Sequence, residues 1–255
     1  MRRREKFVIT STALSLGLFG VQLLPLEWRY VAIGALLFVS YFLSAWALRE
    51  DLQKHEWLTI VPMSVLYAGS VGLFYFLLPE STVSRVVVLG LFGFGMYALL
   101  LTANIYSVAK ARNIQLLYAA HAIGLFFTLF TSLLFANTIF SLRLPFYGNG
   151  LFISLVHFPL ILMSVWSIRL EPRISKELWL LSATLTIMLG ELATILSFFP
   201  FAVWHSALFI MAFLYLGLGV FHSFLRGRLF RGTLNEYSLL AVFVSLLFLL
   251  LFPLK

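Results

Sequence analysis

Five prolines divide this chain into segments of similar length, and each proline follows large apolar residues. The intervals between Pro25, Pro79, Pro145, Pro200 and Pro253 are 54, 66, 55 and 53 residues. An interval of this size holds two apolar helices of about 20 residues and two short turns, the length of a transmembrane helical hairpin. Because proline disrupts helices, each one marks a turn at a membrane face. The spacing therefore predicts repeated up-and-down helical hairpins.

The composition supports a lipid environment for these helices. Hydrophobic residues make up 62% of the chain and charged residues only 11%, with a mean hydropathy of +1.00. Soluble domains carry about 25% charged residues, so this chain has too few to cover a surface that faces water. It has no cysteine, which excludes disulfides and cysteine-ligated zinc or iron–sulfur centres.

We therefore predict an all-α integral membrane protein with a single polytopic membrane domain over residues 1–255. The hydropathy pattern indicates nine transmembrane helices. They are expected at about 7–24, 30–48, 57–78, 85–108, 115–136, 149–168, 178–199, 204–225 and 237–252.

The lysines and arginines fall mainly on one side of these spans. Alternating the loops between two faces puts fourteen of the eighteen on one face. The other face receives only Arg29, Arg85, Arg143 and Lys255. Short cytoplasmic loops carry an excess of positive charge, so the N-terminus is predicted to be cytoplasmic and the C-terminus outside. The expected location is the cytoplasmic (inner) membrane, with membrane lipids, including anionic headgroups at the cytoplasmic face, as partners and no role for nucleic acid.

The helices that lead outwards begin in similar ways, most often with an acid beside an aromatic residue. Examples are Glu56-Trp57 and Glu236-Tyr237. This pattern suggests hairpin repeats over about 1–54, 55–112, 113–176 and 177–234, with a half repeat over 235–255. Duplication and convergence are both open explanations, because an acid at a helix N-terminus favours any helix dipole and aromatics suit any headgroup layer.

Glycines within two spans and a long interval between two prolines lead to two further structural predictions. Glycines in the fourth and eighth spans are expected to let helices approach closely in lipid. They are Gly90, Gly93, Gly95, Gly217 and Gly219. The longest interval between prolines holds extra residues around 138–150, which are expected either to lie on the outer interface or to form a somewhat long loop.

Polar residues inside the spans are the candidates for function, because ionisable groups in a bilayer are costly and often mark a site. Glu191 is the only acid deep within a span, and His157 lies at similar depth on the preceding span. These two, with His205, Thr194 and Ser154, form a predicted substrate or proton site. The alternative is that Glu191 only hydrogen-bonds a neighbouring helix. A metal would need three or four ligands at fixed geometry, and no recognised spacing supports one, so no metal or cofactor is expected.

A second polar group is predicted near the inner face, from Asn104, His121 and His222. Facing histidines could hold haem, but a single candidate pair is weak support, and histidines that reach headgroups or neighbouring backbone are the preferred explanation.

Three functions fit this pattern, and the sequence does not decide between the first two. One is a carrier or binding protein for a small or lipidic substrate, with a buried, proton-sensitive Glu/His site. Another is a non-catalytic structural or accessory subunit that contacts a membrane protein partner or forms a homo-oligomer. An intramembrane lipid-modifying enzyme fits less well, because no catalytic residues are identified and the polar residues are few.

Overall fold

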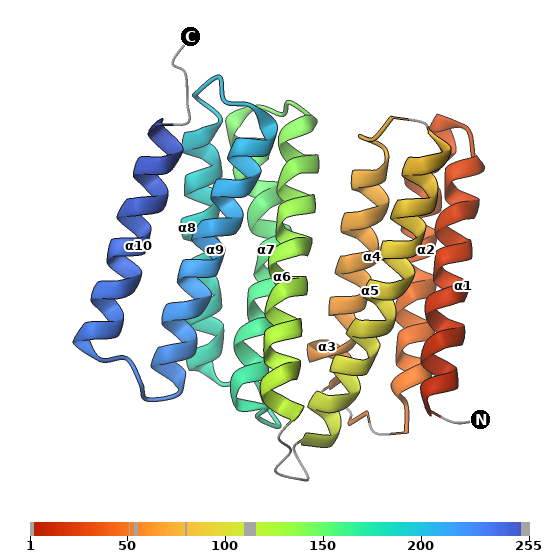
Figure 1. Cartoon of the computed structure of the whole chain (residues 1–255), viewed down its shortest axis with the longest axis horizontal. Coiled ribbons are helices and arrows are strands. Elements are labelled where there is room, and N and C mark those ends of the chain that lie inside the picture. Colours follow the sequence, from red (N-terminus) through yellow and green to blue (C-terminus); the bar gives the residue numbers. More distant parts are fainter. Residues whose placement is uncertain (1–2, 51, 54–55, 80, 110–115, 251–255) are drawn as a thin grey trace. The chain divides into compact units, whose positions relative to one another are not determined.

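The computed structural model describes residues 3–50, 52–53, 56–79, 81–109 and 116–250, which form α-helices joined by short turns (Figure 1). The helices are α1 (Arg3–Leu23), α2 (Leu26–Leu48), α3 (Glu56–Thr59), α4 (Val61–Tyr75), α5 (Thr82–Ala109), α6 (Leu116–Ser141), α7 (Phe146–Arg169), α8 (Lys176–Leu196), α9 (Val203–Leu225) and α10 (Arg231–Leu250).

Nine spans in the described part of the chain are long and apolar enough to cross a membrane, which confirms the predicted number. The third span consists of α3 and α4 together, from Glu56 to Tyr75. Pro25 and Pro145 directly precede α2 and α7, while Pro79 and Pro200 lie in the turns before α5 and α9. Pro253 lies outside the described residues. So do five of the basic residues on which the predicted orientation depends: Arg2, Lys54, Lys110, Arg112 and Lys255.

The extra residues of the longest proline interval do not form a separate external element. Helix α6 continues to Ser141 and α7 begins at Phe146, so only a short turn joins them. In that turn Arg143 takes a left-handed backbone conformation with a φ of 50°, which reverses the chain in few residues. The expectation of a segment lying on the interface is therefore wrong, because the added length extends the two helices instead.

The chain divides into two compact units, and the division falls within α6. Unit 1 is Met1–Phe127 and unit 2 is Thr128–Lys255. In unit 1, α1 packs against α2 and α5, and α4 packs against the same two helices. In unit 2, α7 and α8 pack along each other, α9 contacts both, and α10 contacts α9.

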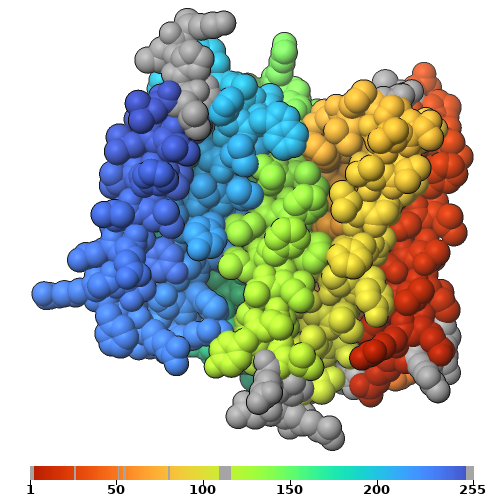
Figure 2. All heavy atoms as spheres, in the orientation of Figure 1, coloured from red at the N-terminus to blue at the C-terminus, as the bar shows by residue number. Residues whose placement is uncertain are grey.

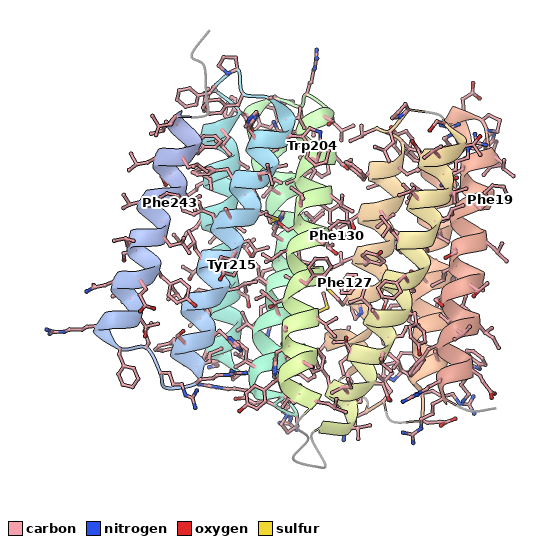
Figure 3. The ribbon with its side chains drawn as sticks, viewed as in Figure 1. Phe19, Phe127, Phe130, Trp204, Tyr215 and Phe243 are labelled. Carbon is pink, nitrogen blue, oxygen red and sulfur yellow. The ribbon has the colours of Figure 1, made fainter. Side chains whose placement is uncertain are left out.

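The core of unit 1 centres on Tyr67 of α4, which is buried. Its ring stacks on Phe92 with 5.6 Å between centroids and meets Phe127 edge-on at 5.4 Å (Phe127 is labelled in Figure 3). The Tyr67 hydroxyl donates a hydrogen bond of 3.1 Å to the carbonyl of Leu91, so the polar end of this large apolar side chain has a partner. Aromatic packing of this kind joins α4 to α5 and to the first half of α6.

The third span is broken between α3 and α4. Pro62 lies at the start of α4 and has no N–H to donate to the preceding turn. The helical bond from Ile60 N to Glu56 O, 2.8 Å long, is still made, but Ile60 itself has a φ of −112° and leaves the regular helix. A local proline thus divides one predicted helix into a four-residue piece and a longer one.

Helix α10 lies beside α9 in unit 2 and has no buried residue (dark blue in Figures 1 and 2). Side chains near both ends of α10 contact α9. Tyr237 lies against Gly219, and Phe248 stacks on Phe209 with 4.0 Å between ring centroids. Phe243, labelled in Figure 3, is exposed on α10. Such a helix is stable only if its remaining faces meet an apolar phase.

Four of the five glycines expected at helix contacts do lie against another helix of their own unit. Gly93 contacts Ser15, Gly95 contacts Tyr67, Gly217 contacts Leu185 and Gly219 contacts Tyr237. Around Gly90 a Cβ would have nothing within 4 Å. The close helix approach predicted from small residues is therefore present at each of these positions except Gly90.

Candidate functional sites

His157 of α7 is completely buried, and both of its ring nitrogens are hydrogen-bonded. The Nδ1 atom lies 2.8 Å from the carbonyl oxygen of Ile153, and Nε2 lies 2.7 Å from the Ser132 hydroxyl on α6. A carbonyl can only accept, so Nδ1 carries the hydrogen in this arrangement. In a neutral ring Nε2 then accepts from Ser132. The histidine thus joins α6 to α7 in the interior of unit 2.

Helices α7 and α8 meet through two matched pairs of small residues. Gly150 and Ser154 on α7 face Gly190 and Thr194 on α8, and each pair has four-residue spacing. A Cβ on Gly150 would overlap Thr194, and one on Gly190 would overlap Ser154. The Gly190 carbonyl oxygen lies only 3.0 Å from where the Gly150 Cβ would be, so the two backbones are almost in contact. This is the close packing that small-xxx-small patterns give in lipid.

The hydroxyls in this contact are used within their own helices. Ser154 donates to the Gly150 carbonyl at 2.8 Å, and Thr194 donates to the Gly190 carbonyl at 2.9 Å. At the end of the same contact, Asn149 Nδ2 donates to Ser197 Oγ at 2.9 Å. Ser154 and Thr194, both predicted to line a substrate site, therefore lie in the packing between α7 and α8.

Glu191 is directed away from this contact. It follows Gly190 by one residue, and one residue is about 100° of rotation around a helix, so it leaves the packed face of α8. Its side chain is exposed, and in the described part of the chain it makes no hydrogen bond or ion pair. The structure thus gives Glu191 and His157 different surroundings, and neither nitrogen of His157 bonds the carboxyl of Glu191.

The surroundings of Glu191 form a continuous surface on α8, which we name the α8 face. Its residues recur every three or four positions, and all are exposed. They are Leu180, Thr184, Ile187, Met188, Glu191 and Ile195. Glu191 is the only one of the six that can carry a charge.

The remaining predicted site residues are half-buried. His205 is near the start of α9, where its backbone N–H donates to the Ala202 carbonyl at 2.9 Å. Asn104 on α5 and His121 on α6 belong to unit 1, where the His121 ring lies 5.5 Å from the ring of Tyr106. His222 is near the end of α9 in unit 2.

Glu56 in unit 1 is an internal acid that the sequence did not identify as a candidate. It is the first residue of α3 and is completely buried, with an exposed fraction of 0%. Its Oε2 atom accepts two hydrogen bonds, from the Gln53 backbone N–H at 2.9 Å and from the Ser107 hydroxyl of α5 at 3.1 Å. The bond from Gln53 resembles a helix capping interaction, whereas the bond from Ser107 ties α3 to the end of α5.

Sequence reasoning assigned Glu56 only to a helix N-terminus, and it does lie there. Its burial could not be read from the pattern, because the chain around it is rich in charge and looks like an exposed loop. Only the packing of α4 against α5 brings Ser107 to the carboxylate. The position of an acid immediately before a proline-broken span was the one available signal.

Ion pairs lie at the ends of helices. Glu50, just after α2, pairs with Lys6 and Arg3, and the Arg3 Nε–Glu50 Oε2 distance is 3.3 Å. The hydrogen bond and charge of Lys6, together with Arg3, lower the pKa of the Glu50 carboxyl below its ordinary value. In unit 2, Arg169 Nη1 lies 2.7 Å from Glu177 Oε2 and joins the end of α7 to the start of α8.

No group of three or more histidine or acidic side chains within the described ranges is placed to hold a metal ion. The described residues form helices and turns, with nine spans suited to a bilayer, and this arrangement is that of multi-pass helical membrane proteins. Comparison with protein families, with curated proteins and with solved structures found no match to this chain.

Proposed function

We propose that this chain is a non-catalytic accessory subunit that binds another membrane protein through the α8 face. The observation that carries the proposal is the placement of Glu191, an acid within a span that lies on an exposed apolar surface. A charged group in hydrocarbon is costly, so such residues face a protein interior, a water-filled cavity or a partner. Glu191 therefore needs one of these surroundings, and the exposed α8 face can receive a partner protein.

The interior of unit 2 supports the same function. His157, Ser154, Thr194 and Asn149 bond to neighbouring helices or to their own backbone. The His157–Ser132 and Asn149–Ser197 bonds join neighbouring helices, as interhelical polar contacts in lipid do. Three of the five residues predicted for the substrate or proton site, His157, Ser154 and Thr194, thus take part in helix packing, which supports the accessory function over the Glu/His carrier.

The test is gentle detergent extraction of the tagged chain from its native membrane, followed by identification of the proteins that co-purify. Ile187→Trp places a large ring in the centre of the α8 face and should remove a specific partner. Leu239→Trp on α10, where the leucine is 75% exposed, is the matched control and should retain it. Equal recovery with both variants, or a bare monomer from the native chain, would count against this function.

A carrier for a small or lipidic substrate is a second candidate, now favoured by unit 1 and not by Glu191 and His157. Transporter sites commonly use broken helices with polar groups at the break. The third span is broken at Ile60, and the buried carboxylate of Glu56 is one turn away. Proton entry into vesicles that contain the purified chain, followed with a pH-sensitive dye, tests this function. Flux that is unchanged by Glu56→Gln would reject Glu56 as its site.

We also propose the orientation with the N-terminus in the cytoplasm and an inner-membrane location. The helix ends that carry Arg3, Lys6 and Arg169 support it. A topology reporter fused after Lys255 should then be active on the outside only.

A further inference from the structure

The depth of Glu191 sets a requirement on anything that covers the α8 face. Glu191 is fifteen residues after Lys176 and five before Leu196, the two ends of α8. At a rise of 1.5 Å per residue these separations are about 22 Å and about 8 Å. The carboxyl therefore lies within the hydrophobic part of the span, in the third nearer its C-terminal end. Exposed Ile187 and Ile195 lie one turn to either side of it.

We infer that the partner presents a transmembrane helix with a lysine or arginine side chain at the depth of Glu191. This inference rests on the proposed accessory function and names the chemistry of its partner. A cationic donor opposite Glu191 would form a short, charge-assisted hydrogen bond and would satisfy both groups within hydrocarbon. The apolar side chains around Glu191 exclude water and strengthen that interaction.

In the described helices no basic residue lies as far from a helix end as Glu191, which is five residues before the end of α8. Lys6 and Arg29 each lie three residues after the start of α1 and α2, and Arg3, Arg169, Lys176 and Arg231 are terminal residues of their helices. Arg85 lies one turn into α5, and its Nε atom is buried within unit 1. The charge complementarity of the α8 face therefore selects a different protein.

The face also specifies the way in which the partner packs. At its centre are branched and long side chains, including Ile187, Met188 and Ile195, and not the glycines that line the contact of α7 with α8. Large side chains keep helix axes further apart, so the partner helix must interdigitate with them. The polar contact at Glu191 then fixes the register, because a mismatch would leave a charge in hydrocarbon.

The requirement for a basic side chain opposite Glu191 can be tested with synthetic helices. The purified full-length chain is mixed with a single synthetic helix in phosphatidylcholine vesicles, and their association is measured. The host helix is a 22-residue leucine-rich span with one lysine in the third that matches Glu191, and its control has leucine there. Energy transfer between fluorophores should show about tenfold tighter association of the lysine helix, the size expected for one interhelical polar contact. Glu191→Leu should abolish the preference, and Thr184→Leu on the same face should retain it. Equal association of the two helices would overturn the inference.

A photoreactive amino acid at Ile187, used in native membranes, separates this inference from the proposed function. Both stand if cross-links join a transmembrane helix that contains lysine or arginine and are lost with Glu191→Leu. A cross-linked helix without a basic residue, or cross-links unaffected by Glu191→Leu, would overturn the inference and leave the accessory function. Cross-links only to lipid or to a second copy would overturn both.

Discussion

Two acids within the helices of units 1 and 2 have opposite surroundings. Glu56 in unit 1 is buried, and its carboxylate accepts hydrogen bonds from Gln53 and Ser107. Glu191 in unit 2 lies exposed on an apolar helix face. A carboxyl that accepts hydrogen bonds inside its own unit contributes to folding, whereas one that faces outwards is available for recognition. The same residue type therefore has two roles, set by the face of the helix it occupies.

The two units also differ in how they use their other polar residues. Unit 2 joins α6 to α7 through the buried Ser132–His157 pair and packs α7 on α8 through facing glycines. Unit 1 relies on the ring cluster of Tyr67, Phe92 and Phe127, which is buried. Substitutions in these places should therefore act through different mechanisms.

The largest contrast should appear in labelling by an apolar carbodiimide, which modifies carboxyl groups that are accessible from hydrocarbon. In the purified chain Glu191 should be modified and Glu56 should not, because only Glu191 is exposed. Mass spectrometry of peptides locates the adducts. Glu191→Gln provides the control, since it should remove the label. Modification of Glu56 at a similar rate would remove the distinction between the two acids.

Replacement of each acid by leucine should separate their effects on stability. Glu56→Leu leaves the Gln53 N–H and the Ser107 hydroxyl without their acceptor in a buried place, and each such loss costs about 1–3 kcal/mol. Glu191→Leu breaks no hydrogen bond in the described structure and should change the free energy of unfolding by less than about 0.5 kcal/mol. Reversible unfolding in mixed detergent micelles measures both. A larger loss for Glu191→Leu would contradict the comparison.

Glycine substitutions should show how much more closely α7 and α8 pack than the exposed part of α5. Gly190→Ala forces a Cβ into Ser154, and overpacking of this kind costs about 1–3 kcal/mol. Gly90→Ala is the matched control, because nothing lies within 4 Å of its Cβ position. It should be neutral or slightly stabilising, since alanine favours a helix by about 1 kcal/mol over glycine. The same unfolding assay compares the two, and equal losses would argue against a close α7–α8 contact.

The smallest change in stability should come from the ion pairs of Glu50, just after α2 in unit 1. Its pKa is lowered by Lys6 and Arg3, so the ion pair stabilises the fold at pH values above the ordinary carboxyl pKa. That contribution is lost as the pH falls through the lowered pKa. Lys6→Gln should raise the pKa of Glu50 towards its ordinary value and flatten this acid dependence. Measuring the free energy of unfolding from neutral to acidic pH checks this prediction. Arg228→Gln in unit 2 is the control, and it should leave the pH dependence unchanged.

Much of the fold could be predicted from the sequence because hydropathy and helix breakers act locally. The nine spans and the turns at Pro25, Pro79, Pro145 and Pro200 needed only the length of an apolar run and the chemistry of proline. The candidate site was harder to predict from the sequence. The sequence placed His157 and Glu191 at similar depth, which is wrong: His157 is eleven residues after the start of α7, whereas Glu191 is five residues before the end of α8. The pattern also does not specify the direction in which a side chain points.

By itself the sequence determined that this chain is helical, that nine of its segments suit a bilayer, and where they turn. These features depend on composition and on contacts between near neighbours in the chain. Only the tertiary structure decided which polar groups meet: Ser107 with Glu56, Ser132 with His157, and no described residue with Glu191. The reason is that each helix can rotate about its axis without changing its hydropathy. The packing of glycines and aromatic rings fixes that rotation.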